Sequence, residues 1–550
     1  MEAETALTKG IALCEKHRFQ DLKYSMQFLL LKVLFRRNRK AAFIAVDKQI
    51  SESLTYKQIQ WVYAFRFLRA SFSLQSGTPA DAPALENLRS ISGIASHRQD
   101  RAIFMVTALL EGLTHLKSRK ADSIVRVQTC IAEASKFQSD PSFHIPQLEV
   151  LRLLLDLACD LQEKNPGGSL SKMKALQARM DELIKTSDWD ASLTELVLPM
   201  KKQSGLSQTI SEDTGTILRP GRDDHDFLVL SFVTKLQAFV LAYCFSGVAL
   251  LYKSSTSMTS SELWEEALGM LAKSHTQMRG RPASLQGAIE HVDWAGEVSS
   301  YIYILIGLTS ATHSNWSKAK ECIDKVENNK SPLGQTLELL ALYLSGCYYQ
   351  GVAKLDQALQ IFEDPRFNID GSAAAFGGSE PGPAEVSVLA ALNRLWIMQE
   401  PSHRDDYKTA ELIEQLRPYC MDSPNKEIQI AWNLVLAAIH TNPALSINQV
   451  KKHIQEGLKS SQHTNNTHCL SIALNIMRYR LFENVVGDQA VKSARAGSVQ
   501  AEKSGNLLWM SVADGMLSQS YEMQGAVAEA QAKRESGTRF ANEALAKTMS

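Results

Sequence analysis

Apolar and polar residues alternate with a helical period along most of the chain. Apolar side chains recur at spacings of three and four residues, and short polar turns such as 36–40 and 313–315 separate the periodic stretches. The pattern predicts a single helix near the start, over 2–14, followed by helical pairs. The first pairs are expected over 21–50, 56–94, 101–134 and 147–185, the last divided by a turn at 165–168.

A fixed step of twelve residues, from a small or apolar residue to a second one, recurs in six of these pairs. The clearest copies run from Gly346 to Ala358, with Tyr349 and Phe362 beside them, and from Gly307 to Ala319, followed by Ile323. Looser copies run from Leu30 to Ala42, Gly112 to Ile124, Ala438 to Val450 and Ser518 to Ala530. A small residue on the first helix lets the second helix pack closely, as in tetratricopeptide repeats. We therefore expect an all-α, tetratricopeptide-like helical-repeat superhelix, with an irregular α-bundle as the alternative.

Two polar interruptions divide this array. We expect N-terminal helical repeats over 1–203, a polar loop over 204–226, central repeats over 227–363, a Gly/Pro-rich insert over 364–385 and C-terminal repeats over 386–550. Because the chain opens in the middle of a repeat, we expect either further residues upstream or a partner that covers the exposed end.

Composition limits the kinds of partner. The 550 residues include 59 basic and 59 acidic side chains, so no overall positive field attracts nucleic acid, and we expect little direct nucleic-acid binding. The eight cysteines lie far apart, without zinc-ligand spacing, which indicates a reducing compartment. The first residues lack the pattern of a signal peptide.

One segment, 227–252, is apolar enough to span a bilayer and carries a single charge at Lys235. A helix that is apolar on all sides can equally be the buried centre of a large soluble array. Its small and aromatic residues at helical spacing, and the lack of a second such segment, favour burial, so we expect no membrane contact.

The sequence offers no convincing reaction centre. The glycine-containing stretches 165–169 and 376–379 lack the spacing and the lysine of a phosphate loop. His468 and Cys469 are adjacent on a predicted helix and point about 100° apart, so they cannot act as a nucleophile–base pair. The acidic run 223–226 could hold a metal, but a solvated loop is the commoner explanation. We therefore predict no enzyme activity, no cofactor and no metal.

The positions expected to face the inside of the superhelix are more informative. They lie on the first helix of a pair, six and three residues before the small residue and one and four after it. Around Gly112, Gly307 and Gly346 they are Val106, Leu109, Leu113 and Leu116; Tyr301, Ile304, Leu308 and Ala311; and Leu340, Tyr343, Cys347 and Gln350. All but Gln350 are apolar. Either tight winding buries them against each other, or a long apolar peptide covers them.

Four segments follow a characteristic order: the stretch 6–50 with its helix joint at 19–24, the piece 101–104 leading to 111–113, the apolar helix near 236–251, and the closing run from 508–509 to 525–526. This order resembles the tetratricopeptide subunit of the cohesin loader, the smaller partner of the HEAT-repeat loader subunit. The chain departs from that family in starting one or two repeats later than animal members and in carrying the Gly-rich insert.

This resemblance implies a non-enzymatic scaffold that wraps the extended N-terminal segment of the large subunit and supports cohesin loading onto chromatin. It also implies a nuclear, chromatin-associated protein that meets cohesin and chromatin indirectly, with ATP hydrolysis left to cohesin. Two alternatives remain: an adaptor or co-chaperone that binds short peptides, and a solenoid subunit of another assembly that binds through its convex face.

Overall fold

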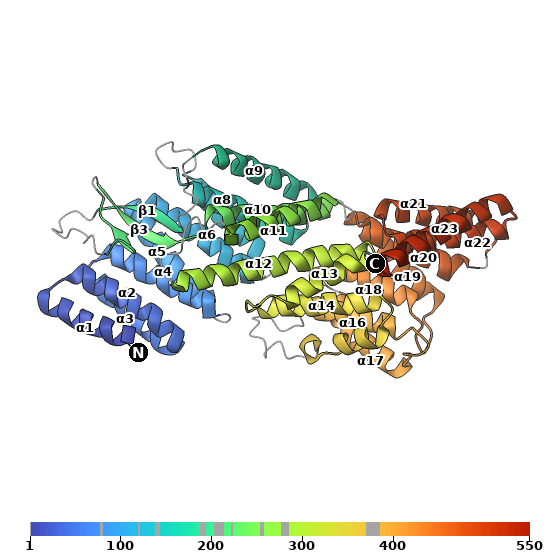
Figure 1. The fold of residues 1–550 in the computed structure, drawn as a ribbon, viewed down its shortest axis with the longest axis horizontal. Coiled ribbons are helices and arrows are strands. Elements are labelled where there is room, and N and C mark those ends of the chain that lie inside the picture. Colours follow the sequence, from blue (N-terminus) through green and yellow to red (C-terminus); the bar gives the residue numbers. More distant parts are fainter. Residues whose placement is uncertain are drawn as a thin grey trace. The chain divides into compact units, whose positions relative to one another are not determined.

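The fold is described from a computed structural model, shown in Figure 1. It describes residues 2–76, 81–118, 122–137, 144–186, 189, 194–202, 214–221, 224–253, 258–276, 285–369, 385–421, 423–483 and 485–549. The chain divides into two compact units. The first is made mainly of Met1–Phe245, and the second of Ser246–Phe376 and Glu380–Ser550.

The first unit begins with antiparallel helices that pack on their neighbours in sequence. They are α1 (Glu2–His17), α2 (Gln20–Arg37), α3 (Arg39–Thr55), α4 (Ile59–Ser76), α5 (Asp81–Arg98), α6 (Arg101–Ser118), α7 (Ser123–Ser135), α8 (Pro146–Glu163) and α9 (Pro166–Lys185). Each lies where the periodicity predicts a helix. Asparagines cap two of them: the Asn38 side chain accepts from the Ala41 N–H at 3.1 Å, and Asn165 does the same for Gly168 at 3.2 Å.

A three-stranded antiparallel sheet follows α9, where the sequence predicts only helix and loop. Its strands are β1 (Glu195–Lys201), β2 (Leu218–Arg219) and β3 (His225–Ser231), in the order β1-β3-β2. The expected polar loop over 204–226 is therefore interrupted by β2 and by the start of β3; residues 203–213 and 222–223 lie outside the described residues. The first residues of the apolar run 227–252 form β3 rather than helix.

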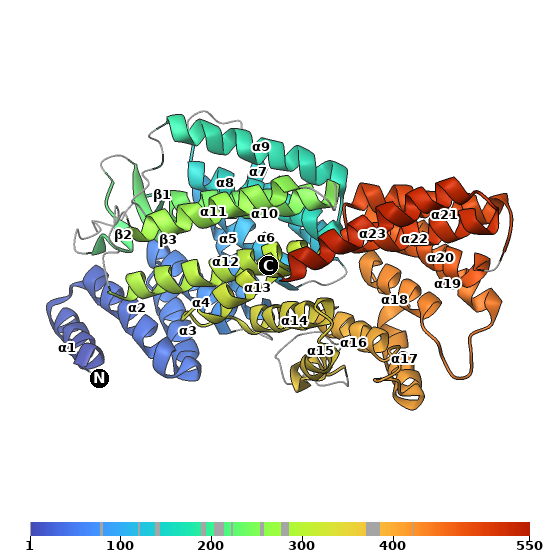
Figure 2. The same cartoon turned by 45° about the vertical axis from the view of Figure 1, so that its right-hand side comes forward.

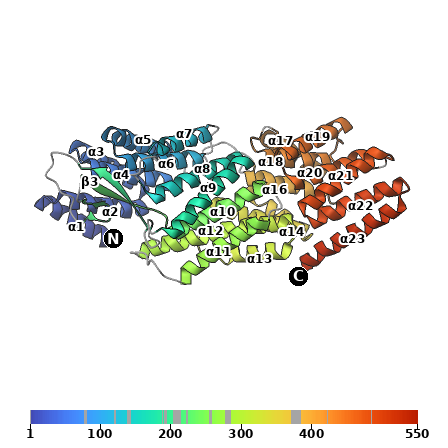
Figure 3. The same ribbon diagram turned by 90° about the horizontal axis from the view of Figure 1, so that it is seen from above.

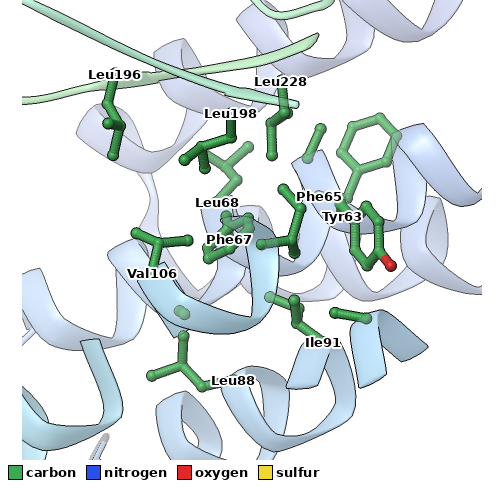
Figure 4. Packing of buried hydrophobic residues seen from close by; sticks show 14 of the residues in the cluster. Tyr63, Phe65, Phe67, Leu68, Leu88, Ile91, Val106, Leu196, Leu198 and Leu228 are labelled. Carbon is green, nitrogen blue, oxygen red and sulfur yellow. The ribbon is translucent and has the colours of Figure 1, made fainter. Parts of the chain in front are cut away.

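The sheet closes the core of the first unit. Leu196 and Leu198 from β1 and Leu228 from β3 point into a cluster of side chains from α4, α5 and α6, including Phe67 and Val106 (Figure 4). Alternate residues of β1 are buried, so one face of this strand supplies the contact. Two strands of the sheet thus complete the core formed by α4, α5 and α6.

The apolar run continues after β3 as α10 (Lys235–Lys253), which confirms a helix near 236–251. Among the described residues, this helix alone is long and apolar enough to cross a membrane by length and composition. Its side chains at Ala238, Val240 and Cys244 are buried inside the protein. At Gly247 an added Cβ would lie 2.3 Å from Trp264 Nε1, so the helix packs closely on α11.

The second unit continues the helical pairs. Its helices are α11 (Met258–Thr276), α12 (Leu285–Thr312), α13 (Trp316–Glu327), α14 (Gln335–Gly351), α15 (Leu355–Phe362), α16 (Glu385–Ile397), α17 (Asp406–Cys420), α18 (Lys426–Ala438), α19 (Ile447–His463), α20 (Thr467–Phe482), α21 (Asp488–Ser504), α22 (Leu507–Met523) and α23 (Val527–Met549). A short 3₁₀ turn, η2 (Pro365–Phe367), opens the segment predicted as an insert, and residues 370–384 lie outside the described residues.

Within this unit the first helices of successive pairs form a continuous series. α12 contacts α14, α14 contacts α16, α16 contacts α18, α18 contacts α20, and α20 contacts α22 (Figure 2). This side-by-side arrangement of equivalent helices is the arrangement of a helical-repeat solenoid. The all-α repeat architecture predicted from the sequence is confirmed, with the small sheet as an addition.

The twelve-residue step marks tightly packed helix crossings. A Cβ added at Gly346 would lie 2.5 Å from Phe362, and one at Gly307 would lie 2.6 Å from Leu344. At the last copy the Ser518 hydroxyl donates to the Ala530 carbonyl at 2.7 Å. At none of the three glycines that begin the step is the residue twelve positions on among the nearest atoms. Phe362 stands in place of Ala358 at Gly346, Leu344 and Cys322 in place of Ala319 at Gly307, and Leu155, Cys130 and Val127 in place of Ile124 at Gly112.

The seams between the last helices are polar. Arg478 on α20 is 1% exposed, and its Nε donates to Ser520 Oγ on α22 at 2.8 Å. Asp514 on α22 is equally buried and accepts from Ser498 Oγ at 2.7 Å and from Lys533 Nζ at 2.9 Å. Hydrogen bonds of buried side chains thus join α20, α21, α22 and α23.

Candidate partner-binding face

The four predicted inner positions of α6 divide into buried and accessible residues. Val106 and Leu109 are buried in the core of the first unit, at 2% and 0% exposure. Leu116 is half-buried against the same core, and Leu113 is 36% exposed. The two buried side chains hold the fold together, which leaves Leu113 and part of Leu116 accessible to a partner.

On α12 three of the four predicted positions are partly accessible. Ile304 is buried at 1% exposure, whereas Tyr301, Leu308 and Ala311 are half-buried. Ile304 therefore belongs to the packing of the second unit. The other three present apolar surface that the chain itself covers incompletely.

On α14 no predicted position is fully buried. Leu340, Tyr343, Cys347 and Gln350 are all half-buried, and in this helix of 17 residues the fully buried ones are Leu344 and Gly346. The helix is nevertheless rich in leucine and tyrosine on every side. Much of its apolar surface is thus only partly covered, and α14 is the strongest candidate for contact with a partner.

Tyr343 has a fixed position at the joint between α14 and α16. Its ring lies 5.9 Å from that of Phe362, and its hydroxyl accepts a hydrogen bond from Asn393 Nδ2 at 3.1 Å. Burial raises the pKa of Tyr343 well above its usual value and raises that of Cys347 to about 12. Both groups are neutral at physiological pH, so this part of the face carries no charge.

The same physics makes the cysteines chemically quiet. Burial raises to about 12 the pKa of Cys130, Cys159, Cys244, Cys322, Cys420 and Cys469 as well. A thiol reacts as its thiolate, and these groups stay protonated. The described residues contain no group of three or more histidine, cysteine or acidic side chains placed to hold a metal. The arrangement on α12 and α14 suits binding of an uncharged, apolar segment.

Sequence reasoning missed one accessible residue that the same spacing could have found. Val512 on α22 lies six positions before Ser518, which corresponds to Tyr301 and Leu340 in their repeats, and it is 41% exposed. The sequence also shows no sign of the contacts made by the turn at Gly505 and Asn506. These contacts join residues almost two hundred positions apart, and no local pattern records them.

Comparisons with known proteins agree with this architecture. A family model described as cohesin loading factor matches residues 1–528. Among solved structures, the chain is similar to "Crystal structure of Scc4 in complex with Scc2n", with a TM-score of 0.51 and 12% identity, covering 94% of this chain and 90% of that chain. At this identity the likeness shows the fold. A search of curated proteins finds no match.

Proposed function

The chain belongs to the cohesin loading factor family, and we propose that it is the non-enzymatic scaffold that wraps the extended N-terminal segment of the large loader subunit. In this role it supports loading of cohesin onto chromatin, works in the nucleus, and meets cohesin and chromatin through its partner. The observation that carries the proposal is the family match over nearly the whole chain, joined to a fold like that of a protein solved in complex with Scc2n.

The half-buried apolar residues of α12 and α14 are the proposed contact surface. Leu308 and Leu340 come from adjacent helices of the series, because α12 packs directly on α14. An extended segment with apolar side chains would cover both, and the partly exposed apolar surface of α14 supports such a contact. On the first unit we propose Leu113 and Leu116 for the same role.

The absence of catalysis is part of the proposal. The protonated thiols named above are poor nucleophiles. Burial lowers the pKa of His468, the neighbour of Cys469, to about 4, so its imidazole is neutral at physiological pH. A scaffold needs neither group to be reactive. Binding and positioning of the large subunit account for the role of the family without a reaction on this chain.

Co-expression with the N-terminal segment of the large loader subunit tests the proposal. We expect one stoichiometric complex in size-exclusion chromatography. Leu308→Asp and Leu340→Asp should each weaken binding about tenfold or more, since a carboxylate cannot be desolvated against an apolar segment. Tyr407→Asp is the matched control, because Tyr407 is 79% exposed on α17, the second helix of its pair.

Two results would count against the proposal. If the wild-type chain and the segment elute separately, the scaffold function is wrong. If both α12 and α14 variants bind normally while charge reversal on the second helices of the pairs abolishes the complex, the partner lies on the convex face instead.

A further inference from the structure

Two turns of the second unit that lie far apart in sequence touch each other. Asn506, which precedes α22, donates a hydrogen bond through Nδ2 to the carbonyl oxygen of Thr312, the last residue of α12, across 194 positions. A Cβ added at Gly505 would lie 4.0 Å from Cδ2 of His313. The turn between α12 and α13 therefore rests directly on the turn between α21 and α22.

Neighbouring elements extend this contact. The ring of His468 on α20 lies 6.5 Å from that of Trp509 on α22, at an interplanar angle of 86°, and close enough to His313 for the two imidazoles to interact electrostatically. α13 also contacts α23, which Figures 2 and 3 show with its C-terminal part approaching α13. The start and the end of the second unit thus meet.

The contact between the two turns closes a circuit, that is, a closed ring of helices in the second unit. The helices α12, α14, α16, α18, α20 and α22 already contact one another in order. Once the α12–α13 turn joins the α21–α22 turn, the series returns to its starting point. α14, whose apolar surface is only partly covered, is a member of this circuit.

We propose that these two turns form a clasp, made by Thr312 and His313 on one side and Gly505 and Asn506 on the other, that closes the second unit around the partner segment. The proposal rests on the function proposed above and adds how the segment is retained. The occupant is the extended N-terminal segment of the large loader subunit. It enters and leaves when the clasp opens.

The chemistry of the contact suits a closure that opens and shuts. Asn506 uses both ends of its side-chain amide: Oδ1 accepts from the Trp509 N–H at 3.0 Å as the cap of α22, and Nδ2 donates to Thr312 across the clasp. A hydrogen bond of this kind exchanges with water at small net cost. Opening the clasp therefore breaks these weak polar contacts and separates α13 from α23, and it leaves the helix pairs intact.

A single substitution separates these two uses of Asn506. Asn506→Asp keeps an oxygen that caps α22, since Asp is as good a cap as Asn. It replaces the donor to Thr312 with a second oxygen that faces a carbonyl oxygen and repels it. The matched control is Asn38→Asp, because Asn38 caps α3 in the same way through the Ala41 N–H and lies outside the clasp.

The test measures association and dissociation rates of the full-length chain with the dye-labelled N-terminal segment of the large loader subunit. We expect Asn506→Asp to raise both rates by about threefold to tenfold and to leave Kd unchanged. This joint change distinguishes a gate from a direct contact, whose loss would raise the dissociation rate alone. Asn38→Asp should leave both rates at the wild-type values.

A locked clasp gives the opposite result. The pair His313→Cys and Gly505→Cys places thiols at positions that approach each other, and a short bismaleimide should join them, since the buried native thiols react slowly. Locked before mixing, the chain should bind the segment at least tenfold more slowly; locked afterwards, it should release the segment at least tenfold more slowly. Each single cysteine variant, treated in the same way, controls for strain at Gly505, where φ is +67°.

The outcomes distinguish the clasp from the function on which it rests. Normal binding by wild type, with rates that neither the open nor the locked variant changes, would overturn the clasp alone. A wild-type chain that fails to bind the segment would overturn the proposed function and the clasp with it.

Discussion

Three glycines of the second unit lie where large side chains cross their helices. An added Cβ would come within 2.5 Å of Phe362 at Gly346, 2.6 Å of Leu344 at Gly307 and 2.1 Å of Trp316 at Gly351. In each case a whole ring or branched side chain occupies the space above the glycine. The helix pairs approach closely because these positions lack a side chain, so packing requires glycine at each of them.

Gly346→Ala should destabilise the second unit by about 1–3 kcal/mol, because the methyl group forces the buried Phe362 ring out of its place. Urea denaturation followed by circular dichroism measures this. The control is Gly269→Ala on α11, where no atom lies within 4 Å of the added Cβ. That variant should gain about 0.5–1 kcal/mol from reduced backbone entropy. Equal effects at the two sites would contradict the packing explanation.

His468 should make stability depend on pH. Burial, followed by the nearby His313, lowers its pKa from 6.5 to about 4 in the folded chain. Protonation therefore favours the unfolded chain: the contribution is complete above pH 6.5 and is lost progressively as the pH falls toward 4. Between pH 7.5 and 5.5, wild type should lose about 1 kcal/mol more than His468→Gln. Parallel pH profiles of the two proteins in urea titrations would show that the imidazole is not buried as described.

Among the elements, the sheet of the first unit is bound to the helices through a buried carboxylate as well as through its apolar face. Asp100, in the turn between α5 and α6, accepts from the Tyr63 hydroxyl and from Arg98 Nε, both at 2.9 Å, and from the Lys201 N–H at 2.7 Å. Arg98 also donates to the Lys201 carbonyl at 2.6 Å. Both backbone groups of the last residue of β1 are thereby bound by the α5–α6 turn.

Asp100→Asn should loosen β1, because a neutral amide accepts these bonds more weakly and brings a donor where three donors already point. We expect a loss of about 2–3 kcal/mol and faster amide hydrogen exchange in β1 and β3. Glu182→Gln, which removes the ion pair between the exposed Glu182 carboxylate and Arg179, should change neither. Unchanged exchange in β1 would mean that the helices hold the sheet without Asp100.

The helices could be predicted from the sequence and the sheet could not, for reasons visible in the strands. Apolar side chains at Leu196, Leu198 and Met200 alternate, but Pro199 lies between them and usually argues against a strand. The apolar residues 227–230 of β3 open the apolar run that continues into α10, so the strand and the helix are not separated in sequence. β2 is two residues long inside a polar stretch. Helical periodicity, in contrast, repeats over many turns and gives a strong signal.

The sequence predicts which helices carry the candidate face, but it does not predict which residues of that face are accessible. The spacing rule places Val106 and Leu340 in equivalent positions, yet Val106 is buried and Leu340 half-buried. The difference comes from the neighbours: the sheet covers α6, and in the described residues no strand covers α14. Contacts between distant segments decide exposure, and a local pattern holds no information about them.

At the scale of the whole molecule, each unit has a core of its own. The cluster around Trp61, Phe65 and Leu198 belongs to the first unit, and the clusters around Phe362 and around Trp432 belong to the second. Repeats stabilise mainly their neighbours, so stability is a property of each stretch of the array. The effects of distant substitutions should then appear separately.

Calorimetry of the full-length chain should resolve this separation. We expect two transitions, with Asp100→Asn lowering the midpoint of one and Gly346→Ala that of the other, because the two residues belong to different compact units.

A bound segment stabilises only the structure that it contacts, by RT ln(1 + [L]/Kd). The N-terminal segment of the large loader subunit should therefore raise both midpoints if it contacts Leu113 and Leu116 in the first unit as well as Leu308 and Leu340 in the second. It should raise one midpoint if its contacts stay within the second unit. Leu340→Asp should then reduce the shift of the Gly346-sensitive transition more than that of the other. A single transition, shifted equally by both substitutions, would show that the chain unfolds as one cooperative body and that the two cores are not independent.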